Sequence, residues 1–194
     1  PARLAARQPN VSFAEFDPVA KSWLAPFVMA GINTRVVHRS NALQNYGYGK
    51  EFKYDEAMMT GNGFKGRLTA MGLAGGMAGF LIGAALPPTR WALEKFVVPK
   101  PGEGPSESSQ KRGSYDLRFY GTGSKGNKLT AKVTGDMDPG YGSTGKMLGE
   151  AAVCLALDIQ EQPGGFWTPA SLMGDKLMSR LQQHAGLAFE LMQS

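Results

Sequence analysis

Cysteine and histidine are scarce in this sequence of 194 residues. The single cysteine, Cys154, excludes an intrachain disulfide and a cysteine-based metal cluster, and its apolar surroundings AAVCLALD indicate a small buried side chain. The two histidines, His38 and His184, lie far apart, and no His/Glu spacing typical of zinc sites is present. A nucleophile elbow of the G-x-S-x-G kind is also missing. The sequence therefore predicts no metal centre and no hydrolase of this type.

Runs of charge are missing as well. The formal net charge is +5, but the basic residues are scattered along the chain. This distribution does not favour nucleic-acid binding, whereas an anionic cofactor, an acidic partner or a membrane surface suits the charge equally well. No signal peptide is visible, and the chain opens on Pro1 rather than Met. We therefore expect a piece of a longer cytoplasmic protein, with membrane association left open.

Glycine, by contrast, is abundant, and three stretches fit the G-x-G-x-x-G spacing of dinucleotide-binding proteins: GNGFKG (61–66), GTGSKG (121–126) and GYGSTG (140–145). The spacing identifies such a site only between a strand and a helix of a βαβ unit. The second match joins two alternating segments and predicts a hairpin turn. The first and third precede helices, but no parallel return strand follows either. We expect none of them to bind a dinucleotide, although the helix after the third could face an anion.

Hydrophobic periodicity gives a coarse map of the elements. It predicts helices at 27–43, 64–84, 89–97, 143–157 and 168–184 and strands near 52–59, 114–121 and 127–135, with a short final strand in HAGLAFEL. A further short helix is expected between Pro18 and Pro26. The polar segment PKPGEGPSESSQKRG (99–113) is predicted to be a flexible loop with little backbone pairing.

Charge is also missing between Arg67 and Pro87, where the nineteen residues LTAMGLAGGMAGFLIGAAL carry none. This length suffices for a transmembrane helix, but the Gly and Ala content weakens insertion and favours close helix packing. The next segment, PPTRWALEKFVVPK, has an interfacial pattern of aromatic and basic residues. We favour a helix packed on protein, within the chain or across a dimer. Contact of residues 68–97 with a membrane surface or a lipid-like substrate, and a true span, stay open.

Several polar residues are candidates for a binding site. On the helix at 27–43, Met29, Ile32, Val36 and Leu43 form an apolar stripe, and Arg35 and Arg39 lie one turn apart on another face, near His38 and Asn41. The arginines form either a solvated basic edge or an anion contact. Strand alternation places Tyr54 and Glu56 on one side, where Glu56 either pairs with a cation or orients a substrate. The candidate set is Arg35, Arg39, Asn41, Tyr54, Glu56 and Tyr141.

Four long blocks carry a family resemblance: FVMAGINTRVVHRSNAL, YGYGKEFKYDEAMMTG, DMDPGYGSTGKMLGEAAVCLALD and GGFWTPASLMGDKLMSRLQQHAGLAFEL. They resemble the C-terminal half of the saccharopine-dehydrogenase-like oxidoreductases, which include the bacterial trans-acting enoyl reductases. The resemblance implies an α+β fold, with a mixed or antiparallel sheet and helices packed on one face. It also implies three segments: a connecting segment and long helix (1–44), a substrate and dimerisation sheet with an inserted apolar helix at 64–97 (45–136), and C-terminal helices (137–194) that pack on a missing Rossmann domain.

The resemblance implies the substrate-binding half of an NAD- or NADP-dependent oxidoreductase. This half would dimerise, and the protein would transfer a hydride to an enoyl or other lipid-like compound. Arg35 and Arg39 are our candidates for anionic groups, and Tyr54, Glu56 and Tyr141 for orienting the substrate or delivering a proton. Asn41 is a further candidate substrate contact, and none of these residues is carried over from a catalytic position of the family. The cofactor would bind mainly upstream, so the fragment alone is expected to be inactive. The alternative is a non-enzymatic, membrane- or lipid-associated binding module that retains the fold.

Overall fold

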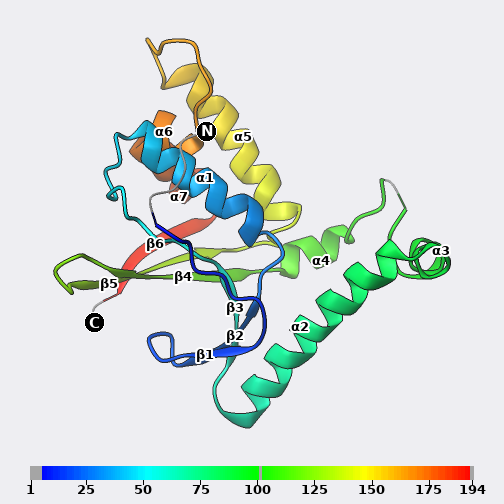
Figure 1. Ribbon diagram of the computed structural model, residues 1–194. Helices are drawn as coiled ribbons and strands as arrows, with labels where there is room; N and C mark the ends of the chain where they lie inside the picture. Colours follow the sequence, from blue (N-terminus) through cyan, green and yellow to red (C-terminus); the bar gives the residue numbers. More distant parts are fainter. Residues whose placement is uncertain (1–5, 101, 193–194) are drawn as a thin grey trace. The chain divides into compact units, whose positions relative to one another are not determined.

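The chain consists of two compact units, Pro1–Glu103 and Gly104–Ser194, each with its own sheet of three antiparallel strands. A computed structural model describes residues 6–100 and 102–192 (Figure 1). The predicted α+β class is confirmed, but a single sheet is wrong, because the strands predicted near 52–59 and at 114–135 belong to different sheets. The three predicted segments 1–44, 45–136 and 137–194 do not coincide with the two units.

The sheet of the first unit contains β1 (Glu15–Asp17), β2 (Ser22–Pro26) and β3 (Ala57–Gly61), in that order. The predicted helix between Pro18 and Pro26 is wrong, because this stretch forms the turn into β2 and β2 itself. The Asp17 carboxylate accepts hydrogen bonds from the backbone N–H groups of Val19 at 2.7 Å and Ala20 at 2.9 Å. Such a side-chain turn competes with a helix for the same backbone donors.

The strand predicted at 52–59 begins later, at Ala57. Side chains, not a neighbouring strand, hold the backbone of residues 52–55. Gln8 donates to the Phe52 carbonyl at 3.2 Å and accepts from the Tyr54 N–H at 3.1 Å, and Asp55 accepts from the Val11 N–H at 3.0 Å. These bonds keep the segment extended outside the sheet.

Three helices complete the first unit: α1 (Ala30–Leu43), α2 (Gly63–Ala85) and α3 (Pro87–Phe96). The first turns of α2 pack on the sheet through Gly66, Ala70 and Ala74, which are buried at four-residue spacing. Thr60 ties β3 to this helix, since its hydroxyl donates to the Gly66 carbonyl at 2.9 Å. After Ala74 the helix diverges from the sheet toward α3 (Figure 1).

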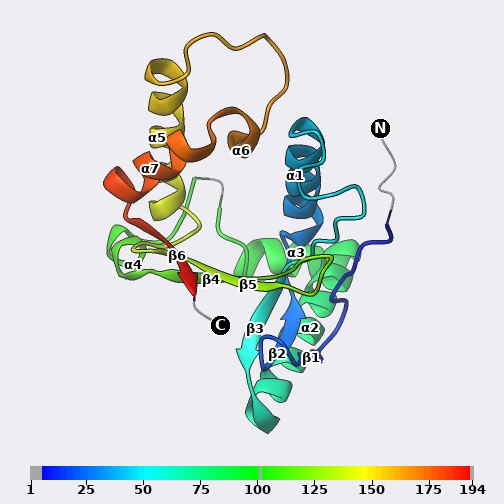
Figure 2. The same ribbon diagram turned by 90° about the vertical axis from the view of Figure 1, so that its left-hand side faces the viewer.

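The second unit contains β4 (Tyr115–Thr122), β5 (Lys128–Gly135) and β6 (Leu187–Met192), paired antiparallel in that order. The GTGSKG stretch forms the β4–β5 hairpin turn as predicted, with a bond from Gly123 N–H to the Asn127 carbonyl at 2.7 Å. Helices α5 (Gly142–Leu157), α6 (Pro169–Leu172) and α7 (Gly174–His184) lie on one side of this sheet (Figure 2).

Helix ends in the second unit follow local capping chemistry. Thr168 and Ser171 form a capping box at α6, with Pro169 at its first position as the sequence predicts. The helix predicted at 168–184 is two helices, because Gly174 has a φ of 44°. The predicted loop 99–113 also contains a helix, α4 (Glu107–Arg112), which Ser106 caps and a 2.6 Å Lys111–Glu107 ion pair bridges. The expectation of little backbone pairing is therefore wrong for this part, and residue 101 lies outside the described residues.

Ion pairs between Arg180 of α7 and the carboxylates of Glu150 and Asp158 connect α7 to α5 and its C-terminal end. The Arg180 guanidinium donates to both carboxylate oxygens of Asp158 and to Glu150 at 3.3 Å, and this contact holds the pKa of Asp158 below its usual range. Cys154 is fully buried beside these ion pairs, as predicted, and burial raises the pKa of its thiol. Because the thiol is buried and protonated, Cys154 has a packing role.

Candidate functional site

A cluster of polar side chains lies between α1 and the segment before β3. Glu56 accepts two hydrogen bonds, one from the side-chain amide of Asn33 at 2.8 Å and one from the hydroxyl of Tyr54 at 3.0 Å. All three side chains are partly buried. Among the described residues Glu56 has no ion pair, so the predicted pairing with a lysine or arginine is not seen. We call Asn33, Tyr54 and Glu56 the carboxylate cluster.

An aromatic wall adjoins the carboxylate cluster. The Phe52 ring lies 6.1 Å from that of Tyr54, 5.3 Å from that of Tyr48 and 5.7 Å from that of His38. His38 Nε2 donates to Gln8 Oε1 at 3.0 Å, because the Gln8 amide nitrogen donates to the Phe52 carbonyl and leaves the oxygen as the acceptor. Burial lowers the pKa of His38, so its ring is neutral at pH 7.

The electrostatics of the cluster keep Tyr54 protonated. Burial raises the pKa of the Tyr54 hydroxyl most, and the adjacent Glu56 charge and its hydrogen bond raise it further. At neutral pH the phenol is therefore a hydrogen-bond or proton donor and not a base. Tyr54 and Glu56 were both predicted as site residues, and the structure brings them together.

The other predicted site residues lie elsewhere. Arg35 and Arg39 are exposed on α1 and, by helical periodicity, face away from Asn33. Asn41 is buried, and its amide closes the following turn by donating to the Gly49 carbonyl at 3.0 Å and accepting from the Tyr48 N–H at 2.9 Å. Tyr141 belongs to the second unit and is exposed at the start of α5.

The apolar stripe predicted on α1 is largely exposed within this chain. Met29, Ile32 and Val36 are 41%, 59% and 45% exposed, whereas Ser40 and Asn41 are buried. Polar side chains of α1 instead bond the rest of the unit: Asn33 bonds Glu56, Asn41 bonds the turn after the helix, and His38 bonds Gln8 of the N-terminal segment. The stripe is therefore available for a further protein contact.

The GYGSTG stretch does not form a phosphate-binding turn. One carboxylate, that of Asp138, accepts the backbone N–H groups of Gly140 at 3.2 Å, Tyr141 at 2.7 Å and Gly142 at 3.1 Å. The donors that would bind a phosphate at this helix start are thus already occupied. Strand β6 also pairs antiparallel with β5, so the parallel strand of a βαβ unit is absent from the described part of this unit.

This arrangement predicts a pH effect. The three N–H groups hold the pKa of Asp138 below its usual range, so the carboxylate stabilises the fold at neutral pH and loses this effect as pH falls below about 4. We expect Asp138→Ala to lower Tm by a few degrees at pH 7 and to flatten the acid side of the Tm profile. Thermal unfolding followed by circular dichroism between pH 3 and 7 measures both. The exposed Glu161→Ala variant is the control, and identical profiles for the two variants would contradict this role.

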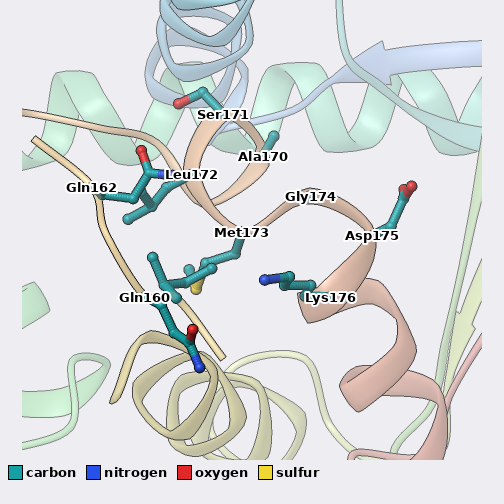
Figure 3. Close-up of a pocket in the computed structure, with 10 residues that line it drawn as sticks. Gln160, Gln162, Ala170, Ser171, Leu172, Met173, Gly174, Asp175 and Lys176 are labelled. Atoms are coloured by element: carbon teal, nitrogen blue, oxygen red, sulfur yellow. The ribbon is translucent and has the colours of Figure 1, made fainter. Parts of the chain in front are cut away.

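An open pocket of about 340 Å³ lies in the second unit, between the loop after α5 and the α6–α7 turn. Figure 3 shows Lys176 directed into it and Asp175 pointing away. The Lys176 ammonium group already donates to the Asp158 carbonyl at 2.7 Å. No group of three metal-ligating side chains occurs among the described residues. The polar residues that line the pocket are Gln160, Gln162, Ser171, Asp175 and Lys176, and Lys176 is already bonded to the end of α5.

Two residues of the site were not predicted. Asn33 and Gln8 carry no pattern of their own, and their partners Glu56 and Tyr54 lie 23 and 46 residues away in sequence. The one available signal was strand alternation, which weakly indicated that Glu56 is buried. A buried carboxylate needs hydrogen-bond donors, but this need does not say which residues supply them.

Comparisons with known proteins give several close relatives. A trans-acting enoyl reductase of Mycobacterium ulcerans is 41% identical over 172 residues, which cover 85% of this chain and 40% of that protein. One of Mycobacterium bovis strain BCG is 39% identical over 171 residues, covering 84% and 40%. A provisionally named one of Mycobacterium tuberculosis strain H37Rv is 40% identical over 168 residues, again covering 84% and 40%. No protein-family model and no solved structure matches the chain. The chain is therefore similar to trans-acting enoyl reductases over most of its own length, and it spans about 40% of the length of each.

Proposed function

We propose that the natural protein containing this chain is an oxidoreductase that reduces enoyl substrates. The observation that carries this proposal is the identity of about 40% to named trans-acting enoyl reductases across 84% of the chain. Reduction of an enoyl group adds a hydride to one carbon of the double bond and a proton to the other. NADH or NADPH is the expected hydride source.

The residues of this chain do not fit the pyrophosphate of such a cofactor. The GYGSTG amides are occupied by Asp138, and GTGSKG is a hairpin turn. The relatives are more than twice as long as the matched region, which leaves room for a Rossmann domain outside this chain. We propose a saccharopine-reductase-like arrangement, in which this chain supplies the substrate side and the closing helices.

The carboxylate cluster is the proposed substrate-orienting site. The Tyr54 hydroxyl is protonated at neutral pH, and Glu56 fixes its direction through a 3.0 Å bond. The aromatic wall of Tyr48, Phe52 and His38 gives an apolar surface beside it. The structure shows the single Tyr54 proton donated to Glu56, so in this proposal the hydroxyl turns from Glu56 to the substrate on binding and then orients or protonates it. Arg35 and Arg39, on another face of α1, contact anionic groups, and Asn41 positions the loop that carries Tyr48. The role of Tyr141, which belongs to the second unit, stays a prediction.

We also propose that the protein is a homodimer. The exposed apolar stripe of α1 supports a protein contact, because Met29, Ile32 and Val36 form an uncovered apolar surface on one helix. Equilibrium sedimentation of the natural protein tests this, and a monomer at micromolar concentration would contradict it.

The activity has a direct test. We expect the natural protein to oxidise NADH or NADPH when a 2-enoyl thioester is added, and the product to gain two hydrogen atoms by mass spectrometry. The isolated chain should neither quench nor enhance NADPH fluorescence, because the amides at the start of its GYGSTG turn already bond Asp138. Micromolar cofactor binding by the isolated chain would contradict the proposed placement of the cofactor. Thioester binding without reduction by the natural protein would favour the non-enzymatic alternative.

A further inference from the structure

The helices α2 and α3 form an apolar hairpin with little protein cover. We call residues 63–100 the α2–α3 hairpin. Within this chain its large apolar side chains are strongly exposed, as illustrated by values of 74% for Phe64, 64% for Ile82 and 73% for Phe96. By length and composition alone, helix α2 is long and apolar enough to cross a membrane. Only 11% of its most apolar 18-residue stretch is buried within this chain. An exposed apolar surface of this extent marks an interaction site.

The geometry of the hairpin is well defined. The two prolines Pro87 and Pro88 end α2 and begin α3. The Thr89 hydroxyl donates to the carbonyl groups of Gly83 and Leu86, and the Leu93 side chain lies against Gly83. The turn therefore fixes α3 against the end of α2.

Helix α2 has an inner and an outer side. Gly66, Ala70 and Ala74 face the sheet, whereas Phe64, Leu68 and Ile82 project from the opposite side by helical periodicity. Because the sheet and the Thr60 bond cover the inner side at its first turns, this helix cannot lie in hydrocarbon along its whole circumference. At these first turns only the outer side is free for an apolar partner, whereas beyond Ala74 apolar side chains are exposed on both sides, with Leu81 62% and Ile82 64% exposed.

Cations and aromatic rings border this apolar surface. Lys65 and Arg67 lie at one end of the hairpin and Arg90, Lys95 and Lys100 at the other, while Glu94 is the only acidic residue between positions 57 and 102. The Lys95 ammonium group lies 4.7 Å from the centre of the Trp91 ring, which is 58% exposed. Exposed tryptophan beside basic residues, around an apolar face, is the pattern of helices that lie in the headgroup region of a bilayer.

We infer that the α2–α3 hairpin docks this protein on an anionic lipid surface, with the outer side of α2 in the headgroup region and the basic residues against lipid phosphates. Charge complementarity selects this partner, because the hairpin carries five cations and one anion. A bilayer span is disfavoured by the sheet that covers Gly66, Ala70 and Ala74. The inference does not depend on the proposed reductase activity.

Vesicle flotation tests the charge requirement. We expect the chain to float with phosphatidylcholine vesicles that contain phosphatidylglycerol, to float weakly with phosphatidylcholine alone, and to be released by high salt. Arg90→Gln/Lys95→Gln should weaken binding about 25-fold, since each cation near an anionic surface contributes roughly a factor of five. The matched control is Lys125→Gln/Lys128→Gln at the β4–β5 turn, which should bind as the wild type does. Equal binding to neutral and anionic vesicles would overturn the inference.

A second pair of variants tests the apolar side. A Cβ atom added at Gly76 or Gly79 would meet no atom within 4 Å, and both positions face outward, so Gly76→Leu/Gly79→Leu should fold normally and float more strongly. The close packing on protein that the sequence predicts for this helix is not seen at Gly76 and Gly79 within this chain. Gly145→Leu/Gly149→Leu, at equally open positions of α5, is the control and should not change flotation. Loss of folding, or self-association of the wild type without flotation, would show that the hairpin packs on protein. Resistance of bound chain to alkaline carbonate would show a span. Each of these results overturns the inference.

Discussion

Replacement of Gly66 by alanine is expected to lower the free energy of unfolding of the first unit by about 3 kcal/mol. Gly66 lies in the first turns of α2, where the helix crosses the end of β3. A methyl group at this position would overlap the backbone carbonyl of Gly61 and lie 3.3 Å from that of Thr60. Backbone atoms cannot turn aside as a flexible side chain does, so the helix itself must move off the sheet and lose the Thr60 bond.

The control for Gly66→Ala lies nine residues further along the same helix. Gly75→Ala meets no atom within 4 Å and should stabilise the unit by about 0.5–1 kcal/mol, because alanine is the better helix former. The two changes are chemically identical, yet their expected effects have opposite signs. Urea unfolding followed by Trp23 fluorescence, with Trp91 and Trp167 replaced by phenylalanine, measures both. If Gly66→Ala proved as stable as the parent, the close approach of α2 to β3 would be wrong.

Long helices were predictable from this sequence because their signals are local. The segments predicted at 64–84 and 143–157 match α2 (Gly63–Ala85) and α5 (Gly142–Leu157) closely, and the β4–β5 hairpin follows from alternation on both sides of a glycine-rich turn. A hydrophobic pattern that repeats over several turns predicts the helix itself, and single capping residues change only where the helix ends.

The predictions of short elements were wrong because single side-chain hydrogen bonds determine whether such a segment forms a turn or a helix. Asp17 turns the chain where a helix was expected, and Ser106 caps a helix where a loop was expected. The division into two sheets could not be read from the strands, since strand pairing joins residues far apart in sequence: β2 pairs with β3 across α1, and β5 with β6 across three helices.

The candidate site was predictable only in part for the same reason. Tyr54 and Glu56 are two residues apart, so alternation alone places them on one side. Their contact with Asn33 depends on which face of α1 packs on the segment before β3. That face is the polar one, from which Asn33 bonds Glu56. The apolar stripe of Met29, Ile32 and Val36 suggested that the apolar face of α1 packs on the rest of the unit, but this face is exposed. Periodicity shows that a helix face is apolar and does not show what covers that face.

Replacement of Tyr54 by phenylalanine is expected to reduce kcat of the natural protein about 100-fold, with KM changed only a few-fold, because a positioned proton donor contributes at least this much. Glu56→Gln should have a smaller effect on kcat, about 10-fold, since glutamine keeps the shape but its single amide oxygen can accept from only one of Tyr54 and Asn33. Tyr46→Phe, at an exposed residue of the same unit, is the control and should leave kcat unchanged. Equal activity of Tyr54→Phe and wild type would remove Tyr54 from the proposed site.

A titration tests the same cluster without any activity measurement. The Glu56 charge and its hydrogen bond both raise the pKa of Tyr54, so Glu56→Gln should bring this pKa down toward 10.0, although burial keeps it above that value. Phenolate absorbance is titrated with and without Tyr54→Phe, in the wild type and in the Glu56→Gln variant. The difference within each background gives the titration of Tyr54 alone. Because the folded chain holds the Tyr54 proton more tightly than the unfolded chain, the wild type should also lose stability as pH rises above about 10, and Tyr54→Phe should lose less. An unchanged Tyr54 pKa in Glu56→Gln would mean that the 3.0 Å contact does not exist in solution.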